Sequence, residues 1–166
     1  MNAVVRTDKM FGTDNRAGLV SVRYQTGENE YAEIQNGNVL LLNGLEAGSR
    51  EVYKGAVPTA NSALADVVLV ASPEVMYDER KRNLDDFINE KGSICRGYHL
   101  HAGDIFSVTK EALAGAESPA VGNVVELMAG TKLNVAGSLT PSSTKVGEII
   151  DINVVGRYTY YVIEVA

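Results

Sequence analysis

The sequence has few of the residues that form cross-links or bind metals in small proteins, and it is also poor in proline and tryptophan. Its 166 residues include one cysteine, two histidines, four prolines and no tryptophan. The single Cys95 excludes an internal disulfide and a multi-cysteine zinc site, so we interpret it as a small buried hydrophobe. A domain of this length buries roughly 70% of its unfolded surface and can fold without a disulfide or a metal.

Long apolar runs and an excess of basic residues are missing as well. The longest apolar run, "VVLVA" at 67–71, is far too short to span a bilayer. The first residues contain no apolar core of signal-peptide length, so we expect synthesis without export and no membrane partner. The net charge of −6 argues against broad nucleic-acid binding, which relies on a basic field.

Motifs of nucleotide and acyl chemistry are also absent. "GLEAGSREVYKG" contains glycines but lacks the Gly-Lys-Ser/Thr ending of a phosphate-binding loop. No Gly-x-Ser-x-Gly elbow occurs. Asp85 and Asp86 are neighbours on a predicted helix, where they would point to different faces and be solvated. The sequence therefore predicts no enzyme activity and no cofactor.

The two histidines are the strongest hint of chemistry. His99 and His101 lie in "YHLHAGDIFSVT", at the spacing that points two side chains of a strand the same way, and Asp104 follows. A catalytic zinc usually takes three protein ligands, and the chain has no third histidine. We predict no native metal and interpret Ala-Gly-Asp as a turn. A cupin-like metal-dependent enzyme using His99 and His101 is the alternative.

Much of the chain has strand character. "DVVLVA" is a short continuous apolar run, which is typical of a strand buried on both faces. "YTYYVIEV" is apolar or aromatic on both faces and predicts a second buried strand, with a stacking platform for sugars as the alternative. Asn36-Gly37, between "YAEIQ" and "NVLLL", predicts a tight hairpin. Asn43-Gly44 is expected to close "NVLLL".

One helix is predicted near residues 78–91. Leu84, Phe87 and Ile88 share one helical stripe, and Gly92 follows where a helix would end. We expect a β-rich α+β fold in three parts. These are an N-terminal arm at 1–16, a β-rich domain with the helix at 17–95, and a small β-barrel or sandwich at 96–166.

The arm mixes polar and apolar residues without a period, so it is not expected to order itself. It is slightly basic in an acidic protein, which suits an acidic partner surface. We expect Arg6, Phe11 and Arg16 to contribute to binding a partner.

The later part of the chain resembles a family of phage proteins. "RGYHLHAGDIFSVT", "PAVGNVVELMAGTKLNV" and "VGEIIDINVVGRYTYYVIEVA" look like small proteins encoded beside the major capsid protein of tailed bacteriophages and prophages, commonly head decoration proteins. "PEVMYDERKRNLDDFINEKG" is less similar. The resemblance implies a structural protein on the outer surface of the virion, with the major capsid protein as partner. A homo-oligomer and a glycan- or host-surface-binding module remain open.

Overall fold

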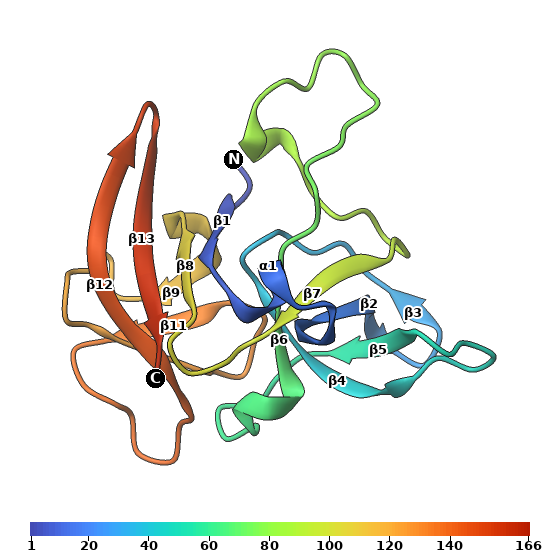
Figure 1. The fold of residues 1–166 in the computed structure, drawn as a ribbon, viewed down its shortest axis with the longest axis horizontal. Coiled ribbons are helices and arrows are strands. Elements are labelled where there is room, and N and C mark those ends of the chain that lie inside the picture. Colours follow the sequence, from blue (N-terminus) through green and yellow to red (C-terminus); the bar gives the residue numbers. More distant parts are fainter.

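Strands dominate the structure, a computed structural model that describes residues 1–166, and they form two sheets (Figure 1). The β-rich α+β class is confirmed. The first sheet has six strands, in the order β3 (Glu30–Tyr31), β2 (Leu19–Gly27), β5 (Val52–Ala56), β4 (Val39–Leu45), β6 (Val67–Val70) and β7 (Cys95–His99). The second has seven, in the order β1 (Val5–Lys9), β8 (Ile105–Val108), β13 (Tyr158–Val165), β12 (Lys145–Val155), β10 (Val124–Glu126), β11 (Leu133–Ala136) and β9 (Leu113–Gly115).

The six-stranded sheet closes on itself. β2 pairs in parallel with β5 along one side and antiparallel with β7 along the other, so β2, β5, β4, β6 and β7 form a small barrel. Gly55 allows this closure, because a β-carbon there would lie 2.7 Å from Val22 and 2.8 Å from Leu40. The closed barrel therefore lies between Leu19 and His99, and not after residue 96 where a barrel or sandwich was expected. β1 and the strands from β8 onward form a curled open sheet that packs against this barrel.

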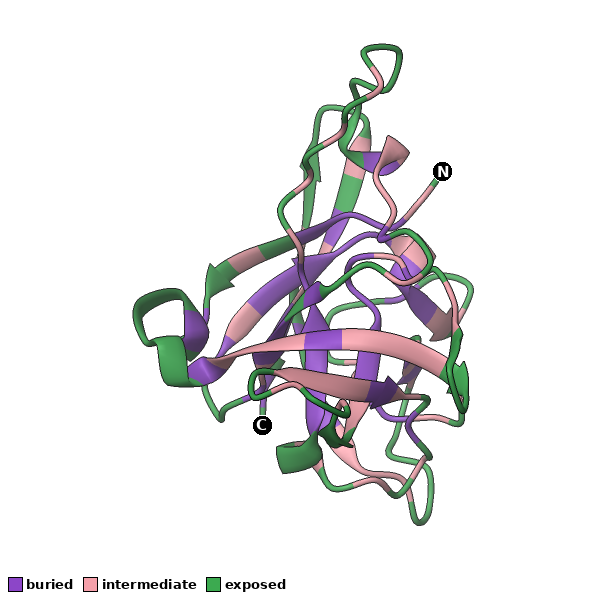
Figure 2. Ribbon diagram, turned by 90° about the vertical axis from the view of Figure 1, so that its right-hand side faces the viewer, coloured by how far each residue is buried: buried purple, intermediate pink, exposed green.

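β6 is buried on both faces, as its apolar run predicts. Val67 and Leu69 face the larger apolar core, which the barrel shares with the seven-stranded sheet. Val68 and Val70 face the barrel interior. In Figure 2 the buried residues gather at the centre of the molecule, where the two sheets meet.

The N-terminal segment is part of this core, so the prediction that it cannot order itself is wrong. β1 pairs antiparallel with β8 at the edge of the seven-stranded sheet. Val4 exchanges hydrogen bonds with Thr109, at 3.1 Å from its N–H to the Thr109 hydroxyl and 3.0 Å from its carbonyl to the Thr109 N–H. Ala3, Val5 and Met10 are buried in the shared core. The open edge of β8 and the apolar surface beside it supply the hydrogen-bond partners and the apolar contacts that the segment cannot provide for itself.

The helix expected near 78–91 is absent, which corrects that prediction. The single α-helix, α1 (Phe11–Asp14), lies elsewhere, and 78–91 contains only a 3-10 turn at Leu84–Asp86. Asp86 accepts hydrogen bonds from the backbone N–H groups of Arg82 and Asn83, and the chain leaves the turn extended at Phe87. Three apolar side chains are too few to bury a helical face, and tertiary contacts hold the segment open instead.

The first Asn-Gly pair forms a turn but not the predicted hairpin. Only Gly37 has a positive φ, +84°, whereas a type I′ turn requires two such residues. The flanking segments separate: Ile34 bridges to Asn89, and β4 pairs with β5 and β6. The second pair, Asn43-Gly44, lies within β4 at a bulge opposite β5 and does not end the strand.

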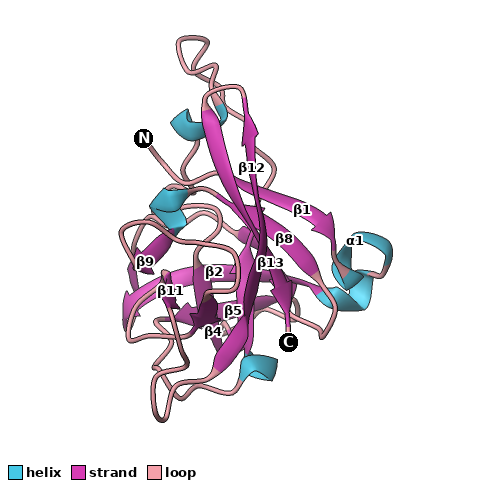
Figure 3. Cartoon of the chain, turned by 90° about the vertical axis from the view of Figure 1, so that its left-hand side faces the viewer, coloured by secondary structure: helices cyan, strands magenta, loops and turns pink.

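β13 is an interior strand of its sheet, between β8 and β12. Tyr160 and Ile163 point to opposite faces and both are buried, but Val162 is half-exposed and Glu164 is exposed. Burial on both faces is therefore confirmed only in part. The β12–β13 hairpin projects beyond the body of the protein (Figures 1 and 3).

Candidate functional site

The two histidines that the alternative interpretation takes as metal ligands lie at the end of β7 and in the connection that follows it. His99 lies on β7 and is half-buried, and its pKa is lowered by burial and by the neighbouring His101. The buried Asp104 carboxylate accepts hydrogen bonds from the backbone N–H groups of His101, at 3.0 Å, and Phe11, at 2.9 Å. Asp104 thereby ties the turn after β7 to the start of α1. No three His, Cys, Asp or Glu side chains lie together as a metal site would require.

The three residues predicted to bind a partner lie in different settings. Arg6 sits on β1, with its guanidinium 5.0 Å from the centre of the Tyr160 ring and 3.6 Å from Asp8. Phe11 packs against the His101 ring, with 4.4 Å between ring centres. Arg16 lies in the 3-10 turn after α1. The structure does not gather them into one patch.

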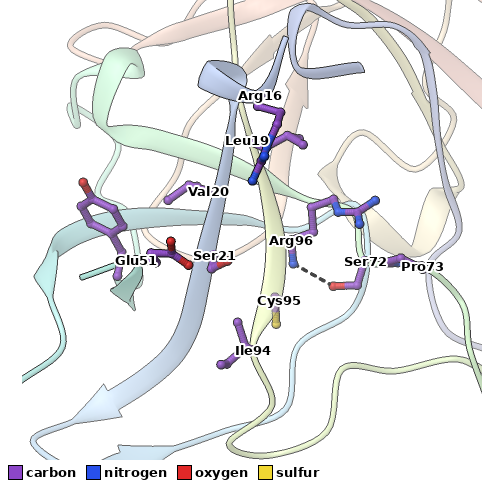
Figure 4. Close-up of a pocket in the computed structure, with 11 residues that line it drawn as sticks. Arg16, Leu19, Val20, Ser21, Glu51, Ser72, Pro73, Ile94, Cys95 and Arg96 are labelled. Atoms are coloured by element: carbon purple, nitrogen blue, oxygen red, sulfur yellow. Dashed lines mark hydrogen bonds between the residues drawn. The ribbon is translucent and has the colours of Figure 1, made fainter. Parts of the chain in front are cut away.

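Arg6 and Arg16 do line neighbouring clefts that meet at Ser72-Pro73. The cleft beside Arg16, of about 530 Å³, lies over β2 and the start of β7 (Figure 4). Arg96 closes one wall and donates its backbone N–H to the Ser72 hydroxyl at 3.1 Å. Cys95 lies at its base, where burial raises the pKa of the thiol to about 11. At neutral pH this thiol stays protonated and is a poor nucleophile.

The long connection between β6 and β7, residues 71–94, borders this cleft. It is the largest irregular segment of the chain, and in Figure 1 it forms the green loop that rises above the body. Loops longer than about 12–15 residues without secondary structure are uncommon in compact domains, and they usually carry function or are disordered. We therefore use the name connecting loop for residues 71–94 and take it as the candidate site.

Asn36 holds the two ends of the connecting loop together. Its amide donates to the Ser72 carbonyl at 2.9 Å and accepts from the Ser72 N–H at 3.0 Å. The Asn89 amide donates to Asn36 Oδ1 at 3.0 Å and to the Ile34 carbonyl at 3.0 Å. Asn36 and Asn89 are both buried. The loop thus has a fixed base.

A buried carboxylate fastens the middle of the connecting loop to the β12–β13 hairpin. Arg157, in the hairpin turn, donates to both oxygens of Asp85, and the Tyr158 hydroxyl donates to Asp85 Oδ1 at 2.8 Å. Burial raises the pKa of Asp85, but the hydrogen bonds from Tyr158 and Arg157 outweigh it and hold this pKa below its ordinary value. The Asn2 N–H donates to the Asp85 carbonyl at 3.0 Å.

Between these anchors the loop presents apolar side chains to solvent. Tyr77 is 96% exposed and Val75 is 62% exposed. Both line a cleft of about 640 Å³, to which four further apolar side chains of the loop contribute: Met76, Phe87, Ile88 and Ile94. Charged residues of both signs follow Tyr77, in the sequence Asp-Glu-Arg-Lys-Arg at 78–82. A fixed loop with exposed apolar side chains among charged neighbours is suited to bind a protein surface.

Sequence reasoning missed the residues that build this site. Asp85 and Arg157 are separated by 72 positions, and Asn36 and Asn89 by 53, so no local pattern connects them. The sequence pattern identifies Asn36 only as part of a turn, whereas in the structure its side chain holds the base of the connecting loop. The sequence pattern places Leu84, Phe87 and Ile88 on the stripe of a helix and gives no role to Val75 or Tyr77.

Comparison with known protein families, curated proteins and solved structures finds no match. No helix of the structure is both long and apolar enough to cross a membrane.

Proposed function

We propose that this protein binds the outer surface of an assembled tailed-phage head through its connecting loop and acts as a decoration protein. The observation that carries the proposal is the loop itself, which exposes Tyr77 and Val75 while Asn36 and Asp85 hold its base and its middle in place. The family resemblance of the later strands supplies the partner, the major capsid protein.

The anchoring favours this role because a preordered loop loses little conformational entropy on binding. A free loop would lose rotamer and backbone freedom at each residue that the partner immobilises. Here the hairpin and Asn36 have already restricted the loop. Tyrosine is also enriched at binding hot spots, because it offers a large apolar area with few rotatable bonds.

The charge of the loop does not select an acidic partner. Residues 71–94 carry six acidic and four basic side chains, and Asp78 pairs with Arg80 at 2.9 Å. The exposed apolar side chains and the anchoring of the loop therefore support the proposal, and its charge does not.

The test is co-sedimentation with decoration-free heads of the phage or prophage that encodes the chain. We expect the full protein to sediment with heads, and the double variant Val75→Ser/Tyr77→Ala to lose at least tenfold in affinity. The matched control is Val121→Ser, which removes an equally exposed apolar side chain from the connection between β9 and β10.

The proposal fails in two ways. If the full protein does not sediment with heads, capsid decoration is wrong. If Val75→Ser/Tyr77→Ala binds as tightly as the control, the connecting loop is not the binding surface.

A further inference from the structure

The outer half of β12 is an open sheet edge. β12 pairs with β10 only through Lys145–Glu148. The next residue, Ile149, donates its N–H to the Asn123 carbonyl at 3.0 Å and accepts from the Gly122 N–H at 2.8 Å. Beyond Ile149 no strand pairs with this side of β12, while β13 covers the other side as far as Val155. In Figure 1 this part of β12 lies on the outer side of the hairpin, away from the rest of the molecule.

The register of the hairpin identifies which backbone groups face the open edge. Val155 and Tyr158 flank the two-residue turn, so they form a hydrogen-bonded pair, and Asn153 with Tyr160 is the next such pair. The intervening residues, Ile152 and Val154, point their N–H and C=O groups away from β13. Four backbone groups on this short stretch are therefore directed outward without a strand partner.

The outer part of this edge has little of the usual protection against pairing. Natural proteins blunt open edges with proline, lysine, a β-bulge or a covering segment. Residues 150–155 contain no proline or lysine, and the bulge of β12, between Ile149 and Asp151, leaves the pairing from Asp151 to Val155 regular. Val154 is 69% exposed, and Ile150 and Val155 are exposed as well. The only charge in the stretch is that of Asp151.

We propose that the open edge of β12 pairs antiparallel with the same edge of a second copy of this chain, about a twofold axis at Asn153. In this register Ile152 lies opposite Val154 of the second copy, and these two outward-facing pairs form four hydrogen bonds. Asp151 lies opposite Val155, and Asn153 opposite Asn153.

A second copy of this chain is the expected partner because the edge is complementary to itself. The β-branched side chains pair with one another on one face of the strand, and on the other face no like charges meet. The unpaired stretch is short, because the backbone of Ile149 is already bonded at one end and the hairpin turn follows Val155 at the other. A partner strand of the same length, such as the same stretch of a second copy, therefore fits it. The pairing goes beyond capsid binding and does not rest on it.

The sharpest test is a cysteine placed on the proposed axis. Asn153 and Asn153 of the second copy form a non-hydrogen-bonded pair, whose α-carbons lie about 4.5 Å apart, within disulfide range. The matched control is Val155→Cys, which is exposed on the same face of the same strand but lies four residues from its copy, more than about 10 Å away. The native Cys95 is buried and serves as the unmodified background.

We expect purified Asn153→Cys protein, oxidised in air and run on a non-reducing gel, to form disulfide dimers at least tenfold faster than Val155→Cys. Adding Val154→Pro to Asn153→Cys should slow the reaction by a similar factor, because proline removes an outward N–H that the hairpin itself does not use. Val154→Thr, which keeps the backbone donor, should leave the rate nearly unchanged.

Equal rates for the two cysteines, or no dimer with either, would overturn the pairing. The assay contains no phage heads, so its failure is distinct from a failure of capsid binding.

Discussion

The N-terminal segment, residues 1–16, and the connecting loop, residues 71–94, are alike in composition and opposite in structure. Both mix charged and apolar residues without a clean strand period. The first places Ala3, Val4 and Met10 in the core, whereas the second leaves Val75 and Tyr77 in solvent. The difference arises from their surroundings. The first segment pairs with an open strand edge at β8. The second pairs with no strand and is held by side chains from distant elements and by a few isolated backbone contacts, such as the bridge between Ile34 and Asn89.

The comparison shows that order has two separate sources here. β1 is ordered by a hydrogen-bonded ladder and by apolar burial. The contacts that order it therefore also contribute to the free energy of unfolding of the whole protein. The connecting loop is ordered by a few buried polar contacts at Asn36 and Asp85, and its exposed side chains contribute little to folding. A surface of that kind can be specialised for binding without loss of the core.

Removing β1 should have the largest effect. Deleting residues 2–10 exposes one edge of β8 and takes four buried apolar side chains out of the core. Three of them, Val4, Val5 and Met10, are each worth about 1.5–3 kcal/mol. This approaches the whole stability of a typical domain. We expect the cooperative unfolding transition to be lost, as followed by circular dichroism during heating.

The control for that deletion is Lys9→Ala, an exposed change on the same strand, which should leave the transition in place. A truncated chain that melts at the temperature of the full chain would mean that the segment is a dispensable arm.

Breaking the base of the connecting loop should have the next largest effect. Asn36→Ala removes three hydrogen bonds and leaves polar groups of Ser72 and Asn89 unpaired, at a cost of about 2–4 kcal/mol. Urea unfolding measures this directly. The exposed Asn43→Ala serves as the matched control and should stay within about 0.5 kcal/mol of the parent. Equal midpoints for the two variants would show that the base does not need Asn36.

The anchor at Asp85 should give a smaller and pH-dependent effect. Asp85→Asn keeps the shape but weakens the bonds from Arg157 and Tyr158, and we expect a loss of about 1–3 kcal/mol at pH 7. Because the folded-state pKa of Asp85 lies below its unfolded value, the contribution is present above about pH 4–5. It is lost as the pH falls through the folded-state pKa.

The free energies of unfolding of Asp85→Asn and the parent, measured as a function of pH, should therefore converge in acid. The exposed Asp14→Asn is the control for the substitution itself and should stay within about 0.5 kcal/mol of the parent at pH 7. A difference between Asp85→Asn and the parent that grows as the pH falls would contradict the direction of this pKa.

The smallest effect on stability is expected at the tip of the connecting loop. Tyr77 is exposed and makes no hydrogen bond, so Tyr77→Ala should change the free energy of unfolding by less than about 0.5 kcal/mol. Thermal melting of this single variant measures it. A loss of 2 kcal/mol or more would show that the tip, like β1, belongs to the folding core.

Prediction from sequence succeeded where a residue's fate depends on its immediate neighbours. The run at 67–70 is buried on both faces because four consecutive apolar residues cannot all be satisfied by one face of a sheet. The turn at Asn36-Gly37 exists because glycine adopts positive φ without strain, although β4 then pairs elsewhere. The prediction of a helix at 78–91 was wrong because three apolar positions are a weak helical pattern, which tertiary contacts readily override.

By itself, the sequence determined the β-rich class, the doubly buried β6 and the turn at Gly37, since each depends on local backbone preference and local polarity. Only the tertiary structure decided that β1 joins β8, that Asn36 and Asp85 hold the connecting loop, and that the edge of β12 stays open. These are pairings between segments dozens of residues apart. Their free energy comes from groups that meet only after the chain has folded, so no local pattern records them.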